Sequence, residues 1–321
     1  MTMKKIHSLF LPAVVAGIAS IVTSGIASAD NVFVANNGNS TVSEISNGVT
    51  TTFIATDLNS PTGIAIYGNN VFVANNGNNA GFISEFALSN GAFEGTYSTG
   101  EDGPRGMAFD SFGNLYVANE NNGTVTKIPT GGGVGSTVVS GNNSPGITFA
   151  TGLAFDKSGN LYVASAADDT ISKVTFSSPG VVGNVSTFAS AGLNFPTGIA
   201  FDSAGNLLVV NQNTSQILKF SPTGAPLGAV ITDGNASDIP EAVAVDSLGN
   251  LWVTDYGDGK VTEYDSSGNA LNTFIGGGIA GPCFDTTQVV VPEPSAYALL
   301  TAGLGLLFFI ARRKTARALV G

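Results

Sequence analysis

The sequence predicts an all-β protein built from similar four-stranded units that are arranged as a ring. A strand, a tight turn and a second strand form the stretch Gly106–Asn119 (GMAFDSFGNLYVAN), and related copies begin at Gly63, Gly152, Gly198 and Ala242. The asparagine that precedes each second strand falls at positions 31, 70, 114, 160, 206 and 250, so the period is 39 to 46 residues. Such a period, with several short strands in each unit, is typical of the blades of a β-propeller.

Turn chemistry and strand composition support this fold class. An aspartate opens each full-length turn and can accept a hydrogen bond from the backbone two residues on, while a glycine three residues later supplies a positive φ. These pairs are Asp110/Gly113, Asp156/Gly159, Asp202/Gly205 and Asp246/Gly249. The strand that follows is apolar on both faces, as expected for a sheet packed between two neighbouring sheets.

The ends of the repeat region predict how the ring closes. The first unit offers only three strands, at Asn31–Ala35, Thr41–Ile45 and Thr51–Ala55. Near the other end, Cys283-Phe284-Asp285 aligns with Ala108-Phe109-Asp110, so we expect this segment to complete the first blade, with Pro282 at the strand start. The sequence therefore predicts a single six-bladed propeller over residues 30–288, closed by strands from both termini.

Composition excludes several classes of function. Residues 30–294 carry 23 acidic and six basic side chains, a net charge of −17, so nucleic acid is not an expected partner. A single cysteine, Cys283, excludes a disulfide framework. The only histidine is His7, which excludes a Ser-His-Asp triad and a histidine general base in the propeller.

Both termini have the character of targeting segments. Residues 1–29 combine two lysines, an apolar run and a small-residue cleavage pattern at Ala27 and Ala29, which predicts a signal peptide for export through the Sec translocon. At the other end, an apolar run of 16 residues, 296–311, is followed by Arg312 and further basic residues. As a helix it would span about 24 Å, a little less than a bilayer core of about 30 Å, with the basic end in the cytoplasm.

Two family resemblances extend these predictions. The Pro-x-Gly-Ile-Ala-Phe-Asp-x-x-Gly-Asn-Leu-Tyr-Val-Ala-Asn units resemble NHL repeats, which implies a six-bladed propeller and relatives such as gluconolactonase-like hydrolases and streptogramin-lyase-like proteins. The segment Val291-Pro292-Glu293-Pro294 before the apolar run makes residues 289–321 resemble a PEP-CTERM sorting signal. That resemblance implies membrane anchoring by a C-terminal helix, cleavage by an exosortase and delivery to the cell surface. The alternative interpretation is a permanent C-terminal anchor.

Charged side chains before two innermost strands are candidate ligand residues. Where other units have threonine, Arg105 and Glu241 occur in units three and six, opposite each other in a six-fold ring. Together with Glu120 and Asp255 they form the candidate channel-mouth site, either as a polar pair or as a pair that holds a ligand. The alternative interpretation is that Arg105 and Glu241 are solvated residues of the rim.

A metal site is a second hypothesis for the same region. One polar residue follows the second strand of every unit: Asn36, Asn75, Asn119, Ser165, Asn211 and Asp255. A ring of oxygen atoms could bind Ca²⁺, which takes six to eight oxygen ligands; Asp255, Glu241 and Asn119 are the weak candidates, and gluconolactonase-like relatives imply a channel metal. The alternative is that these side chains satisfy loop backbone groups, with no cofactor.

The sequence thus predicts an exported, surface-sorted propeller that acts as a non-catalytic binding or scaffold module. Its expected partners are the exosortase, the Sec translocon, the membrane before processing, and an extracellular polysaccharide or matrix protein, with a link to biofilm. A channel-metal lactonase resembling gluconolactonase is the alternative, and a purely structural coat component is a third hypothesis.

Overall fold

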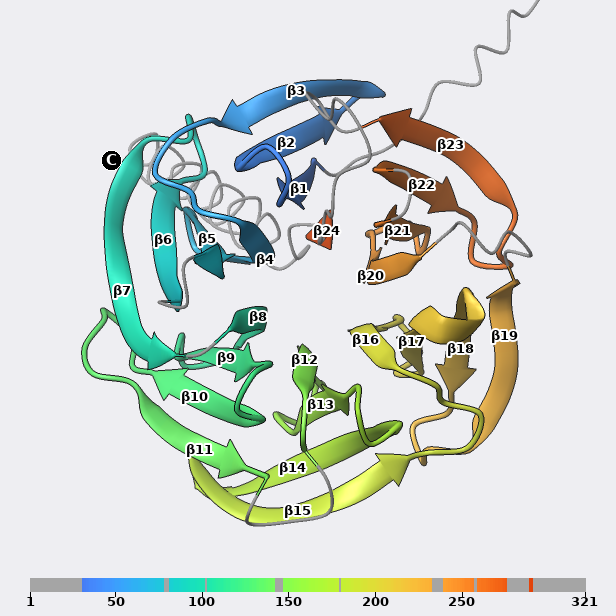
Figure 1. The fold of residues 1–321 in the computed structure, drawn as a ribbon. Helices are drawn as coiled ribbons and strands as arrows, with labels where there is room; N and C mark the ends of the chain where they lie inside the picture. The colour runs from blue at the N-terminus through green and yellow to red at the C-terminus, as the bar shows by residue number, and fades with distance from the viewer. Residues whose placement is uncertain are drawn as a thin grey trace, which may run out of the picture.

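The protein folds into a ring of six four-stranded antiparallel sheets, as the computed structural model shows (Figure 1). The described residues are 31–77, 81–101, 103–141, 147–178, 180–232, 239–256, 259–275 and 289–290. The prediction of an all-β, six-bladed propeller is confirmed.

In five blades the strands pair in sequence order from the central axis outward, and in the first blade β24 pairs with β1 on the inner side. The first three blades consist of β24 (Val289–Val290), β1 (Val32–Asn36), β2 (Thr41–Ser46) and β3 (Val49–Ile54); β4 (Pro61–Tyr67), β5 (Asn70–Asn75), β6 (Gly81–Ala87) and β7 (Phe93–Glu101); and β8 (Pro104–Phe109), β9 (Leu115–Asn119), β10 (Thr124–Ile128) and β11 (Ser136–Ser140).

The last three blades repeat this order on the other side of the ring (Figure 1). They consist of β12 (Ala150–Phe155), β13 (Leu161–Ser165), β14 (Thr170–Ser178) and β15 (Val181–Ala189); β16 (Pro196–Phe201), β17 (Leu207–Asn211), the 3-10 helix η2 (Gln212–Thr214), β18 (Gln216–Phe220) and β19 (Pro226–Thr232); and β20 (Pro240–Val245), β21 (Leu251–Asp255), β22 (Lys260–Tyr264) and β23 (Ala270–Ile275).

The turn between the first two strands of a full-length unit forms as its sequence predicts. In the third blade, Asp110 Oδ1 accepts hydrogen bonds from the backbone N–H groups of Phe112 and Asn114, both at 2.9 Å. Gly113 has a φ of 80°, a conformation that costs an L side chain about 1–2 kcal/mol. The turns at Asp156, Asp202 and Asp246 repeat the bond to the asparagine that follows. Turn chemistry therefore fixes the register of each inner hairpin.

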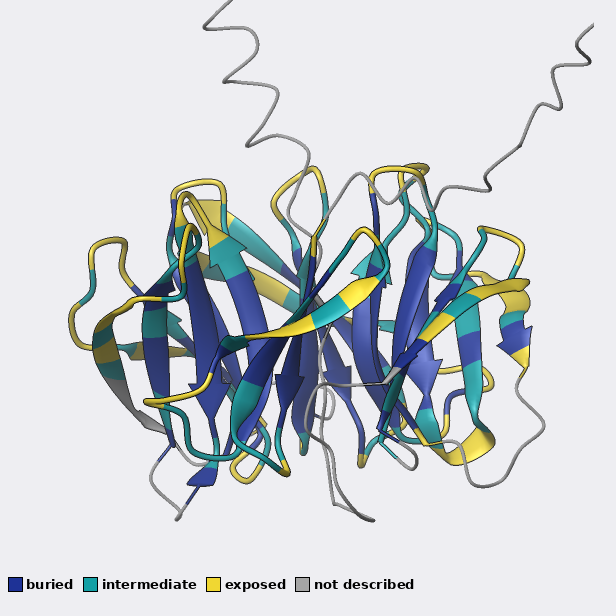
Figure 2. Cartoon of the chain, turned by 90° about the horizontal axis from the view of Figure 1, so that it is seen from above, coloured by how far each residue is buried: buried dark blue, intermediate teal, exposed yellow. Residues whose placement is uncertain are grey.

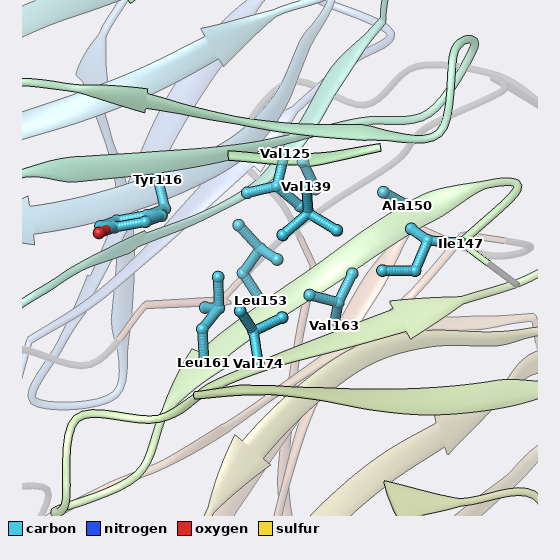
Figure 3. Close-up of a cluster of buried hydrophobic side chains, with 10 residues drawn as sticks. Tyr116, Val125, Val139, Ile147, Ala150, Leu153, Leu161, Val163 and Val174 are labelled. Atoms are coloured by element: carbon cyan, nitrogen blue, oxygen red, sulfur yellow. The ribbon is translucent and has the colours of Figure 1, made fainter. Parts of the chain in front are cut away.

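The hydrophobic core lies between the blades and leaves the outer strands exposed (Figure 2). One cluster joins Tyr116 and Val125 of the third blade to Leu153, Leu161 and Val163 of the fourth (Figure 3). Second strands are buried along both faces, as in β9 and β13, because each sheet is covered by a neighbour on either side. Burial of one such Val or Leu side chain contributes about 1.5–3 kcal/mol, so adjacent blades stabilise each other.

The innermost strands approach each other so closely that glycine is required between them. A Cβ atom added to Gly106 would lie 2.3 Å from the carbonyl oxygen of Thr151, and one added to Gly152 would lie 2.2 Å from that of Thr197. In three blades the residue before the corresponding glycine is a threonine, and it hydrogen bonds to the backbone of the next blade. Thr197 Oγ1 donates to the carbonyl of Glu241 at 2.8 Å, and Thr151 Oγ1 donates to that of Pro196 at 3.1 Å. These hydrogen bonds couple successive blades around the axis.

The first blade contains strands from both ends of the described chain. β24 pairs antiparallel with β1, with Val290 opposite Phe33 and Val289 opposite Val34. The segment predicted to close the ring, Cys283-Phe284-Asp285, lies outside the described residues, as does Pro282. Closure through that segment therefore stays a prediction.

Candidate functional site

A cluster of charged side chains joins opposite sides of the ring at its axis. Arg105 on β8 hydrogen bonds to Glu241 on β20 through Nη2, and its Nη1 lies 2.8 Å from Glu120 Oε1. Gln212 Nε2 of η2 donates to the second carboxylate oxygen of Glu241 at 2.5 Å. We call Arg105, Glu120, Gln212 and Glu241 the axial cluster. Its members come from the third, fifth and sixth blades, so the circular arrangement of the blades brings them together.

Position within the repeat explains why these side chains meet. Arg105 and Glu241 occupy the strand position at which Thr62, Thr151 and Thr197 hydrogen bond to the next blade. From this position in the third and sixth blades, the long charged side chains of Arg105 and Glu241 extend toward each other across the ring. Glu120 and Gln212 share another position, directly after the last residue of the second strand.

The axial cluster is largely removed from solvent. The side chains of Arg105 and Glu241 are 9% and 5% exposed, whereas that of Glu120 is 19% exposed. The interpretation of Arg105 and Glu241 as solvated rim residues is therefore wrong. Sequence alone could not decide this, because burial at the axis depends on how closely six innermost strands approach each other. Their role toward a ligand stays a prediction.

Burial and charge act in opposite directions on the two buried partners. Burial disfavours the charge of Arg105, but the carboxylates of Glu241 and Glu120 outweigh it and raise the pKa of the guanidinium. Burial raises the pKa of Glu241; Arg105 opposes this rise, and the negative charge of Glu120 adds to it. Arg105 is therefore a fixed cation, and two carboxylates share it, so the axial cluster carries a net negative charge when both are ionised.

Several of the polar side chains that end the second strands hydrogen bond to loops of their own blades. Asn75 Oδ1 accepts the backbone N–H of Asn59 at 2.8 Å, and Asn211 Oδ1 accepts that of Asn194 at 2.6 Å. Asp255 Oδ1 accepts the backbone N–H of Ile239 at 3.1 Å. Each of these loops leads into the innermost strand of the same blade. This arrangement favours the interpretation that the polar ring satisfies backbone groups.

The same geometry bears on the calcium hypothesis. Within the described parts of the chain, no group of three or more His, Cys, Asp or Glu side chains could hold a metal ion. Asp255 accepts from a backbone N–H, and Glu241 faces the guanidinium of Arg105, which would repel a cation. Asn119 Nδ2 donates to the hydroxyls of Thr124 and Thr126, and its Oδ1 is buried with no hydrogen-bond partner. One such oxygen falls far short of the six to eight that calcium takes, so these residues do not fit the ion.

One member of the axial cluster was not among the sequence-based candidates. Gln212 is the fifth-blade counterpart of Glu120, because both directly follow the asparagine that ends the second strand, Asn211 and Asn119. A comparison of that position across the units would have identified it. Asp255, which was a candidate, hydrogen bonds to the loop of its own blade through the backbone N–H of Ile239.

The targeting residues lie outside the described part of the chain. These are Ala27 and Ala29 of the predicted signal peptide, and Val291, Pro292, Glu293 and Pro294 of the sorting segment. Among the residues that the structure does describe, no helix has the length and apolarity needed to cross a membrane. The predicted C-terminal helix, residues 296–311, also falls outside them.

Fold and C-terminal motif together define the class of protein: a six-bladed β-propeller that carries a surface-sorting signal. Residues 290–314 match the family model of the PEP-CTERM protein-sorting motif. The protein is therefore an exported, C-terminally anchored cell-surface protein that exosortase processes. The match covers the sorting region and leaves the ligand of the propeller open.

Solved structures similar to this chain are propellers from functionally different proteins. A nidogen/laminin complex contains a chain with a TM-score of 0.66 and 18% identity, covering 81% of this chain and 98% of that one. A virginiamycin B lyase from Staphylococcus aureus has a TM-score of 0.58 and 17% identity, covering 76% and 80%. A streptogramin B lyase has a TM-score of 0.56 and 14% identity, and the match covers 76% of this chain and 87% of that one. At these identities the likeness shows the fold alone, and no curated protein sequence matches the chain.

Proposed function

We propose that this protein is a non-catalytic binding module of the cell surface or extracellular matrix, and that its ligand is a neutral extracellular polysaccharide. The observation that carries the proposal is the axial cluster, in which a buried arginine is held between carboxylates from separate blades. Its two less buried members, Glu120 and Gln212, offer a hydrogen-bond acceptor and a donor to hydroxyl groups. A net charge of −17 over residues 30–294 repels polyanions, which favours a neutral chain of sugars over an acidic one.

Delivery to that setting rests on the two ends of the chain. We infer that the signal peptide is removed after Ala29, that residues 296–311 form a membrane helix, and that the exosortase cuts near Val291-Pro292-Glu293-Pro294. Proline restricts φ and has no backbone N–H, so a Pro-Glu-Pro sequence favours an extended chain without ladder hydrogen bonds, which suits the cleft of a protease. The released propeller would then reside in the matrix, with a role in biofilm.

The sorting step is tested by changing the motif while the apolar run is kept. The Pro292→Ala/Glu293→Ala double variant should accumulate uncleaved in the membrane fraction, as judged by its mass. A Thr286→Ala/Thr287→Ala variant, a few residues upstream, is the control and should be cleaved normally. Normal release of the motif variant would contradict exosortase processing.

The binding role is tested with the full-length protein and polysaccharide extracted from the matrix of the host cells. Glu120→Gln, which alters the most exposed acid of the axial cluster, should reduce retention on immobilised polysaccharide by about tenfold, the loss expected for one charge-assisted hydrogen bond. Glu94→Gln makes the same change on an exposed position of β7 and should have no effect.

Two further outcomes would decide against this function. Lactone hydrolysis that requires added calcium would support the channel-metal lactonase instead. If the protein shows neither retention on polysaccharide nor lactone hydrolysis, the hypothesis of a purely structural coat component remains. Retention that is equal for the native protein and for Glu120→Gln would show that polysaccharide binds elsewhere than at the axial cluster.

A further inference from the structure

A cavity of about 160 Å³ lies between the second and third blades, away from the axial cluster. Phe72 and Tyr97 of the second blade and Phe109 of the third contribute to its lining, and the loop Pro129–Gly132 covers one side. Phe109 ends β8 and pairs with Leu115, whereas Arg105 lies near the start of the same strand. The cavity and the axial cluster are therefore at opposite ends of the blades.

Comparison with the next junction shows how this space arises. Between the third and fourth blades, the ring of Phe176 packs 5.8 Å from Tyr116 and 6.3 Å from Phe155. In the repeat, Tyr116 and Phe155 correspond to Phe72 and Phe109 one junction earlier. The ring centroids are 5.1 Å apart in the first pair and 4.9 Å apart in the second.

The residue that corresponds to Phe176 in the third blade is Thr130. β14 continues as a strand past Val174 to Ser178, whereas β10 ends at the equivalent Ile128 and Pro129 follows. The third blade thus has a short side chain where the fourth blade has a phenyl ring. We call the cavity the ring slot, because it occupies the place that an aromatic ring fills in the neighbouring junction.

The volume of the ring slot matches one six-membered ring. An engineered protein cavity of about 150 Å³ binds benzene. Drug-sized ligands take pockets of about 300–1,000 Å³, so a larger molecule would not be enclosed here. The slot is accessible, since Thr130 and Gly131 are exposed and Tyr67, which stacks on Phe109 at 4.8 Å, is 42% exposed.

One edge of the slot is polar. Glu85 accepts a hydrogen bond from the Tyr97 hydroxyl and a second, of 2.5 Å, from Asn70 Nδ2. Burial, followed by the hydrogen bond to Glu85, raises the pKa of Tyr97 to about 12, so the hydroxyl remains protonated at neutral pH. A carboxylate has about four lone-pair sites, which leaves Glu85 able to accept from a ligand as well.

We propose that the ring slot binds a single neutral pyranose ring, such as the terminal sugar of a glycan. The apolar faces of a pyranose suit the walls formed by Phe72, Tyr97 and Phe109, and its hydroxyls suit the edge formed by Glu85 and Asn70. A plain aromatic ring would fill the space but leave that polar edge without new partners. This site does not depend on the axial cluster, and it limits recognition to an exposed sugar end.

The test uses the full-length protein in a zwitterionic detergent that has no sugar headgroup. Glucose, N-acetylglucosamine, glucosamine and phenol are titrated by saturation-transfer NMR. The neutral sugars should bind with a Kd on the order of 1–10 mM, as expected for a ligand of about a dozen heavy atoms.

Two substitutions at one position separate filling of the slot from loss of a hydroxyl. Thr130→Phe places an aromatic ring where Phe176 lies in the junction between the third and fourth blades. This ring should fill the slot and weaken sugar binding at least tenfold. Thr130→Val also removes the hydrogen bond from Thr130 Oγ1 to the carbonyl of Phe112, but leaves the slot open, so it should keep the native Kd within about twofold. Lys219→Met, on β18 of the fifth blade and outside both proposed sites, should leave monosaccharide binding unchanged.

Several outcomes would overturn the proposal. Sugar binding that Thr130→Phe leaves unchanged would place the sugar elsewhere. Binding of phenol alone would indicate an aromatic side chain of a partner protein, and binding of glucosamine alone would indicate a site for a cation. If Thr130→Phe does not melt cooperatively, Glu85→Gln replaces it and should weaken sugar binding by at least about threefold; no change would contradict the polar edge as the recognition element.

Discussion

Replacing Arg105 by methionine should expose how strongly the axial cluster is held together. The change removes the cation but keeps much of the side-chain volume, and it leaves the buried carboxylate of Glu241 with the hydrogen bond from Gln212. Removing one partner of a buried ion pair typically costs about 3–5 kcal/mol of unfolding free energy, because the other charge stays desolvated. For a domain of this size that corresponds to a fall in Tm of about 6–20 °C.

The defect of Arg105→Met should depend on pH in a defined direction. Without Arg105, the pKa of Glu241 rises further, since the guanidinium opposes the rise caused by burial. Above the ordinary pKa of a glutamate, the folded variant then holds a proton that the unfolded chain releases, so its stability falls as pH increases. The loss of stability relative to the native protein should therefore be larger at pH 7 than at pH 5.

Urea unfolding at both pH values, followed by circular dichroism, measures these effects. Arg105→Met/Glu241→Leu replaces the pair by apolar side chains and should recover most of the lost stability, because the uncompensated charge is gone. Lys219→Met is the matched control; it breaks a pair with Asp202 whose side chains are 27% and 16% exposed, and should cost no more than about 1 kcal/mol. A cost below 1 kcal/mol for Arg105→Met, or a double variant less stable than the single one, would refute this account.

Two further predictions concern the contacts between blades, and both are measured by the same unfolding assay. Gly106→Ala places a Cβ atom 2.3 Å from the carbonyl oxygen of Thr151 and should cost more than Gly159→Ala, where only the positive φ opposes a side chain, at about 1–2 kcal/mol; equal costs would argue against the close approach. Thr62→Val keeps the shape of the side chain but removes its 2.7 Å hydrogen bond to the carbonyl of Pro104, and should cost about 1–3 kcal/mol; an unchanged midpoint would show that this bond does not couple the blades.

The fold was predictable because every repeat unit contains the same turn and strand signals. The hydrogen bonds of the turn at Asp110 and Gly113 join residues that are adjacent in the sequence, so the geometry of the turn can be predicted from the sequence. A strand that is apolar on both faces, such as β9, requires cover on both sides, and a ring of sheets supplies it. These signals are short-range or periodic, and neither depends on details of distant parts of the chain.

The candidate site was predictable only in part, because its contacts join units far apart in sequence. Register placed Arg105 and Glu241 in opposite blades, but their burial depends on the width of the axis, which no single repeat encodes. Gln212 enters the axial cluster from a third blade. The ring slot depends on where β10 ends relative to β14, a difference of a few residues that becomes visible when the two junctions are compared in space.

Departures from the repeat are therefore the places to look for function in this protein. At the second position of the innermost strand, Thr62, Thr151 and Thr197 each fasten one blade to the next. Arg105 and Glu241 give up that short hydrogen bond and form one across the axis, where burial makes an ion pair costly unless it is fully partnered. A neutral threonine would hold the blades together without this cost, so we propose that the two charges serve the binding role rather than stability. The double variant tests this directly: if it is as stable as the native protein yet no longer retained on polysaccharide, the charges serve binding.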